Sequence, residues 1–160
     1  MKSRGSWLES AIETCNRQYR LNKRARVDKV ATPTSVNPKK GTAYFTKKST
    51  VDFTGFYKGG AVAFDTKETG VTNFPFKNVH QHQVDYLKEV KTYYNVDAFL
   101  LIWFKKYQEL YKIDIDDYIE LQEYYRSEEK RESIPYKWFK LKGNEIKKGK
   151  YVYYDYLEIE

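Results

Sequence analysis

The chain has 160 residues, with 29 Lys/Arg against 22 Asp/Glu and a formal net charge of +7. This length is typical of one domain with a hydrophobic core, so we expect a single domain over residues 1–160. The only cysteine, Cys15, excludes an internal disulfide framework, and no apolar run is long enough to span a membrane. Because the first residues also lack the apolar stretch of a signal peptide, we expect a soluble, cytoplasmic protein with no membrane partner.

The positive charge is concentrated in the first third of the chain. Residues 1–58 contain 13 Lys/Arg and four Asp/Glu, whereas residues 59–160 contain 16 and 18. A concentrated basic region is what neutralising nucleic-acid phosphates requires. A solubilising surface is the other interpretation, and charge alone leaves both open.

The N-terminal part of the chain predicts a helix, a strand and a protrusion. Four apolar residues recur at helical spacing within residues 6–20, which predicts a helix. They are Leu8, Ile12, Cys15 and Tyr19. Ser6 is a candidate N-cap with Glu9 as its capping-box partner. A strand is expected over residues 25–31, and residues 32–42, with two prolines and a glycine, predict a loop or protrusion.

The remainder of the chain predicts a mixed α/β fold with its strands clustered at the centre. Lys58-Gly59-Gly60 is a hairpin signal between two strands rich in Phe, Val and Ala. The expected strands are 51–57, 61–67, 96–104 and 109–114, and the expected helices are 79–94 and 114–129. A polar linker and a tail of alternating aromatic and basic residues follow, with a turn expected at residues 142–144.

The stretch TVDFTGFYKGGAVAFDTKE, residues 50–68, carries more charge than an apolar hairpin needs. Successive side chains of a strand alternate between faces, so Asp65 and Lys67 share a face, and the hairpin turn brings Asp52 to the same end. Two adjacent carboxylates repel unless a proton or a cation separates them, and carboxylate oxygens are suitable Mg²⁺ ligands. With a lysine beside them, they indicate metal-assisted phosphodiester hydrolysis. An ordinary surface Asp–Lys pair with a solvated Asp52 is the alternative.

Three blocks of the sequence resemble one family in order and in separation. They are RGSWLESAIE, STVDFTGFYKGGAVAFDTKET and NFPFKNVHQHQVDYL. On these blocks the chain resembles the RecU family of Holliday-junction resolvases, and Asp52 followed by Asp65-Thr66-Lys67 is similar to the PD-(D/E)xK nuclease signature. The resemblance implies an α/β, restriction-endonuclease-like core, in which helices flank a central mixed β-sheet and a short stalk protrudes around residues 32–42.

The resemblance also implies an activity. It indicates a metal-dependent, structure-selective endonuclease that resolves four-way DNA junctions by paired symmetric nicks in DNA recombination and repair. Mg²⁺ would be the cofactor, with Mn²⁺ as a substitute, and the partners would be branched double-stranded DNA and a second copy of the chain. The alternatives are a restriction-like or flap endonuclease acting on other DNA, and a non-catalytic DNA-binding module on the same scaffold. The small size favours a phage-encoded short form over a bacterial one.

Individual site residues follow from the same resemblance. Asp52 and Asp65 would be metal ligands, and the backbone carbonyl of Thr66 is a further candidate ligand. Lys67 would be the catalytic lysine. Glu9 would reach in from the first helix as another acidic ligand, directly or through water, although its capping role is a serious alternative.

Further residues would position or bind the DNA. Gln83 would position the scissile phosphate or the site itself. The residues expected to contact DNA are Arg4, Arg24, Arg26, Lys39, Lys40, Lys47 and Lys48. His80 and His82 are two positions apart on an expected helix and so do not share a face, which favours packing or DNA contact over a metal pair.

Two departures from the family pattern stand out. The family usually has Glu where this chain has Asp65, and the missing methylene draws the carboxylate back by about 1.5 Å. We therefore expect a weaker or shifted metal preference but not a loss of metal binding. The stalk at residues 32–42 is also shorter than is typical of the family, which puts the selectivity for junctions in doubt.

Overall fold

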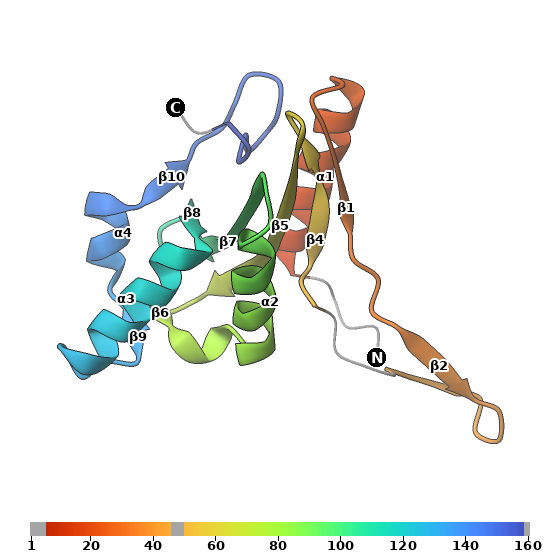
Figure 1. Ribbon diagram of the computed structural model, residues 1–160, viewed down its shortest axis with the longest axis horizontal. Helices are drawn as coiled ribbons and strands as arrows, with labels where there is room; N and C mark the ends of the chain where they lie inside the picture. The colour runs from red at the N-terminus through yellow and green to blue at the C-terminus, as the bar shows by residue number, and fades with distance from the viewer. Residues whose placement is uncertain (1–5, 46–49, 159–160) are drawn as a thin grey trace.

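A six-stranded mixed sheet forms the centre of the computed structural model, which describes residues 6–45 and 50–158 (Figure 1). The strand order is β1-β4-β5-β7-β8-β10, in which β5 and β7 are parallel and the other neighbours antiparallel. These strands are β1 (Ala25–Lys29), β4 (Phe53–Tyr57), β5 (Gly60–Thr69), β7 (Val96–Phe104), β8 (Glu109–Asp114) and β10 (Asn144–Ile146). The predicted α/β class with a central mixed sheet is confirmed.

Helices cover both faces of this sheet, and each face has its own hydrophobic core. The helices are α1 (Trp7–Leu21), α2 (Gln81–Lys91), α3 (Ile115–Ser127) and α4 (Tyr136–Lys142). The apolar stripe of α1 is buried on one face, and Ser6 caps this helix by accepting a hydrogen bond from the Glu9 N–H at 3.1 Å. Helices α2, α3 and α4 bury Val84, Tyr118 and Phe139 on the other face. The side-chain alternation along β5 and β7 therefore decides which helix each residue faces.

The β4–β5 hairpin is the predicted one, and its register positions the carboxylates. Phe53 pairs with Phe64, and Tyr57 pairs with Gly60, which leaves a two-residue turn at Lys58 and Gly59. Both turn residues have positive φ, 47° and 73°, as tight hairpin turns of this length require. The same pairing, extended by one residue beyond β4, sets Asp52 opposite Asp65.

The predicted protrusion is confirmed, and it is a β-hairpin that extends beyond residues 32–42 to Phe45. Strands β2 (Thr34–Asn37) and β3 (Thr42–Phe45) pair antiparallel and project away from the sheet (Figure 1). Pro33 and Pro38 lie just outside β2, where neither removes a hydrogen bond from the pairing. The turn is closed by the Asn37 carboxamide oxygen, which accepts hydrogen bonds from the N–H groups of Lys39 and Lys40.

The C-terminal region differs from the predicted alternating tail. Helix α4 and strand β10 occupy its first part, and the last described residues return to pack against α1. There the Tyr156 hydroxyl donates to the Asn16 side chain, and the Tyr19 hydroxyl donates to Asp155 at 2.7 Å. A pair of two-residue strands, β6 (Phe74–Pro75) and β9 (Ser133–Ile134), joins the segment before α2 to the expected polar linker. Among the described residues, no helix has the length and apolar character to cross a membrane.

Gly55 tests the close approach of β1 to β4. A Cβ atom at this position would lie 2.2 Å from the backbone oxygen of Arg26, so β1 or β4 would have to move. We expect Gly55→Ala to lower the free energy of unfolding by roughly 2 kcal/mol or more, as measured by chemical denaturation. Gly70→Ala is the matched control, because nothing lies within 4 Å of its Cβ position. Equal stability of the two variants would contradict the strand packing described above.

Candidate active site

Asp52 and Asp65 lie side by side across the β4–β5 hairpin, as the alternation predicts. The Asp52 N–H donates to Oδ1 of Asp65 at 3.0 Å. Oδ2 of Asp52 accepts two hydrogen bonds from Thr66, from the backbone N–H and from the hydroxyl, each at 2.8 Å. The shorter side chain of Asp65 therefore still reaches its neighbour. Both carboxylates are held by backbone groups of the central sheet.

Lys67 completes the cluster on the face covered by α2. Its Nζ lies 2.6 Å from Oδ2 of Asp65 and donates to Oε1 of Gln83 at 2.9 Å. Oε1 of Gln83 also accepts a hydrogen bond from the His80 N–H at 3.1 Å, so the first turn of α2 is tied to the lysine. Gln83 thus holds the ammonium group and not the carboxylates.

The environment of Asp65 favours a proton or a cation at this position. The side chain is fully buried, and burial raises the pKa of its carboxyl group to about 7. The Lys67 ammonium opposes this shift of the pKa, and the Asp52 charge adds to it. Oδ2 of Asp65 faces the Lys67 ammonium at 2.6 Å. Two adjacent carboxylates, one of them fully buried, are a donor set that suits a divalent cation.

Glu9 is not brought into this pair. Its carboxylate accepts a hydrogen bond from Lys29 Nζ at 2.9 Å, and only its backbone N–H takes part in the Ser6 cap. Within residues 6–45 and 50–158, no three His, Cys, Asp or Glu side chains form a cluster that could hold a metal. The hydrogen bond to Glu9 is the main cause of a raised pKa at Lys29, and the Asp52 charge contributes to it, so Glu9 and Lys29 lie within the electrostatic reach of the site.

The arginines expected to contact DNA have partners within the protein. Arg24 forms ion pairs with Asp155 and Glu158, at 2.9 and 3.3 Å, and so holds the C-terminal segment. Arg26 pairs with Asp28 on the exposed surface at 2.8 Å. Contact of either arginine with DNA stays a prediction.

The structure describes two of the other residues expected to contact DNA. Lys39 and Lys40 are exposed at the tip of the β2–β3 hairpin, where they are free to meet a phosphate backbone. Arg4, Lys47 and Lys48 lie outside the described residues.

The prediction that His80 and His82 do not share a face is wrong, because their rings lie against one another. His80 has an extended backbone and stands at the N-cap of α2, so helical spacing does not apply to it. The two rings are stacked, with centroids 5.7 Å apart and planes 12° from parallel. They lie next to Gln83, at the rim of the site.

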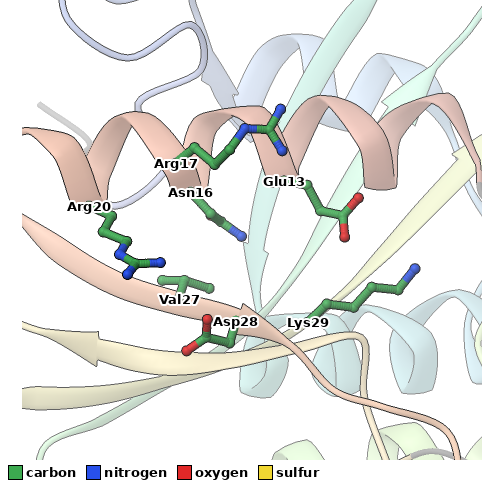
Figure 2. A pocket seen from close by; sticks show the side chains of 7 residues that line it. All are labelled: Glu13, Asn16, Arg17, Arg20, Val27, Asp28 and Lys29. Carbon is green, nitrogen blue, oxygen red and sulfur yellow. The ribbon is translucent and has the colours of Figure 1, made fainter.

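A charged groove beside the site was missed from the sequence (Figure 2). It lies between α1 and β1, where Arg17 and Arg20 extend from the helix and Lys29 from the strand, with Glu13 and Asp28 among them. The three-residue spacing of the two arginines was the available signal, because it places them on one side of a helix. Lys29 carried no such signal, since its partner Glu9 is 20 positions away.

Comparison with known proteins assigns the chain to a family. The family model described as "Recombination protein U" matches residues 3–159. The chain belongs to the RecU family. Curated relatives named Holliday junction resolvase RecU include that of Shouchella clausii, 35% identical over 96% of this chain and 77% of the relative. That of Geobacillus sp. is 32% identical over 98% of this chain and 82% of the relative.

A structural comparison adds a distant neighbour. The structure of Archaeoglobus fulgidus Hjc, titled a Holliday junction resolvase from an archaeal hyperthermophile, aligns with 60% of this RecU-family chain and 68% of its own. The TM-score is 0.41 at 10% identity, which is too low to support an argument. The family assignment therefore depends on the sequence relationship. The RecU relatives named above are bacterial, and the expected phage origin stays a prediction.

The raised pKa of Asp65 predicts how the stability of the metal-free protein changes with pH. Because the folded state holds a proton with a pKa of about 7 and the unfolded state releases it near 3.8, the folded state binds more protons between these values. The contribution of this group to stability is therefore greatest below about pH 4 and is lost as the pH rises through about 7, by on the order of 2–4 kcal/mol. Urea denaturation in EDTA, from pH 4.5 to 8, measures the slope, and Asp65→Asn should remove this component. A wild-type slope equal to that of the variant would contradict the burial of an ionisable pair.

Proposed function

We propose that this RecU-family protein is a divalent-metal-dependent endonuclease that resolves four-way DNA junctions. The observation that carries the proposal is the Asp52–Asp65 pair, with Lys67 held beside it by Gln83. Membership of the family, and relatives named Holliday junction resolvase over most of their length, support the substrate class. We infer a cytoplasmic site of action, where bacterial DNA recombination takes place.

Asp52 and Asp65 would hold the cation, and Mg²⁺ is the metal we propose, with Mn²⁺ as a substitute. The fully buried Asp65 carboxylate, with Asp52 directly beside it, supports this assignment. The cation would supply Lewis-acid stabilisation and a more acidic bound water for attack on phosphorus. Glu9 would act through water, because its carboxylate is paired with Lys29. The carbonyl oxygen of Thr66 remains a candidate ligand at the next position of β5.

Lys67 would stabilise the negative charge that develops on the phosphoryl oxygens. Its ammonium is already fixed by Gln83, so little reorganisation is needed when the phosphate arrives. Lys29 is the second cation within electrostatic reach of Asp52. The exposed Lys39 and Lys40 would contact the phosphate backbone from the hairpin tip. Affinity for DNA should therefore fall steeply as salt is added.

Two symmetric nicks require two active sites, so we propose a homodimer with two-fold symmetry. The aromatic C-terminal segment buries Tyr154 and Tyr156 against the core and leaves Tyr151 and Tyr153 66% and 41% exposed. Phe56 and Tyr93 are 71% and 60% exposed beside grooves between the β4–β5 hairpin and α2. This apolar patch is the surface that we favour for dimerisation.

The test is nicking of a labelled synthetic four-way junction beside a linear duplex of the same sequence, with and without Mg²⁺. We expect paired symmetric nicks in the junction alone, and only with the metal. Asp65→Asn should bind the junction with wild-type affinity but nick it at least about 10³-fold more slowly. The matched control is Asp117→Asn, which changes an exposed carboxylate on α3 and should leave the rate unchanged.

The other outcomes are distinct from one another. Equal cutting of junction and duplex would leave a nuclease and contradict the selectivity for junctions. Tight binding by the wild-type protein, with no cutting in Mg²⁺ or Mn²⁺, would favour a non-catalytic DNA-binding module.

A further inference from the structure

Trp7, the first residue of α1, has a large aromatic side chain that is half-exposed to solvent. Its exposed fraction is 49%, and its ring lies on Trp103, with centroids 4.5 Å apart and planes 35° from parallel. Trp103 is only 5% exposed and belongs to the central strand β7. One face of the Trp7 indole is therefore supported by the sheet, and much of the remaining ring surface meets solvent.

The first turn of α1, which carries Trp7, is fixed by hydrogen bonds. The N–H of the next residue, Leu8, donates to Oε1 of Glu68 at 2.6 Å, and Ser6 caps the same helical turn. Glu68 is itself paired in register with Trp103 across β5 and β7. An aromatic ring that is fixed before binding loses little conformational entropy when a ligand stacks on it.

The position of Trp7 relates it to the candidate active site. Glu68 directly follows Lys67 on β5, and its side chain points to the opposite, α1 face of the same strand end. Two positions after Trp7, Glu9 pairs with Lys29, whose raised pKa depends first on Glu9 and also on the charge of Asp52. Trp7 therefore stands on the α1 face of the sheet, near the end of β5 that follows Asp65 and Lys67.

A lysine shares the Glu68 carboxylate that anchors the helical turn of Trp7. Lys105, in the turn after β7, pairs with Oε2 of Glu68 at 3.1 Å and is more than half exposed. The N–H of Lys105 donates to the carbonyl of Thr69 at 3.0 Å, which fixes this turn to the end of β5. A rigid aromatic face with a cation beside it is the combination that single-stranded and unstacked nucleotides require.

We propose that Trp7 stacks on a base of branched DNA that has lost a stacking neighbour, while Lys105 contacts an adjacent phosphate. This inference rests on the proposed function. In a linear duplex every internal base is stacked on both sides, whereas bases at a branch point are more easily unstacked. Stacking on an aromatic ring accepts any base, because every base has a π-face. Trp7 is thus a specificity-determining residue that favours branched over linear DNA without reading sequence.

The competing explanation is that Trp7 only covers Trp103. Trp7→Leu separates the two explanations, since leucine keeps an apolar cover but has no ring to stack, and Trp7→Phe retains a ring. Tyr94→Leu is the matched control, because Tyr94 is 98% exposed and precedes β7, at the opposite end of the strand from the site. Equilibrium dissociation constants are measured in EDTA, so that no DNA is cut, for a four-way junction and for a linear duplex of the same sequence.

We expect Trp7→Leu to weaken junction binding by roughly 5- to 100-fold, the loss of one base–aromatic stack, and duplex binding by less than about 2-fold. Trp7→Phe should recover most of the difference, and Tyr94→Leu should bind both DNAs as the wild-type protein does. Wild-type junction affinity in Trp7→Leu, or an equal loss on both DNAs, would overturn the proposal.

A fluorescent base gives a readout that does not depend on a variant. With 2-aminopurine at the branch point, wild-type protein and Trp7→Phe should quench the emission on binding, and Trp7→Leu should not. An absence of quenching by the wild-type protein would overturn the stacking role even if Trp7→Leu failed to fold. A wild-type protein that binds junction and duplex equally would instead count against the proposed function on which the inference rests.

Discussion

The contact between two carboxylates, Asp52 and Asp65, is the constraint on which the site depends. Asp65 is fully buried, yet its neighbour across the hairpin is another acid, so the ionised form is unfavourable and its pKa rises to about 7. A folded chain retains such a pair only where the surrounding backbone holds it, and here the Asp52 N–H and Thr66 do so. The pair therefore favours binding of a proton or a cation between the two carboxylates.

Three parts of the fold position the groups of the site: the β4–β5 turn, helix α2 and helix α1. The two-residue turn at Lys58 and Gly59 sets the β4–β5 alignment, and a slip by one residue would move Asp65 to the other face of the sheet. Helix α2 supplies Gln83, which fixes Lys67. Helix α1, anchored to β5 through the side chain of Glu68, brings Glu9 to Lys29 of β1, which lies within electrostatic reach of Asp52. The groups of the candidate site therefore stand on strands and helices of the core or, for Asp52, one residue before a strand.

Much of the site could be predicted because it is local in the sequence. The alternation along β5 and the turn signal are short-range, so they placed Asp52, Asp65 and Lys67 together before any tertiary contact was known. The Glu9–Lys29 pair and the anchor between Leu8 and Glu68 could not be predicted, since they depend on how α1 docks on the sheet. The hairpin at residues 34–45 was not predicted because two prolines flank its first strand, although both fall outside the pairing. The structure of the tail was not predicted because it depends on burial of the aromatic side chains against α1.

The most direct test of this account is whether cation binding displaces the proton from Asp65. Mn²⁺ or Mg²⁺ is titrated into the protein at pH 6.5 by calorimetry, in two buffers with different ionisation enthalpies. With a pKa of about 7, Asp65 is mostly protonated there, so binding should release about 0.8 proton, and Asp65→Asn should release none. Binding without proton release by the wild-type protein, or equal release by Asp65→Asn, would contradict the claim that this buried pair holds the metal.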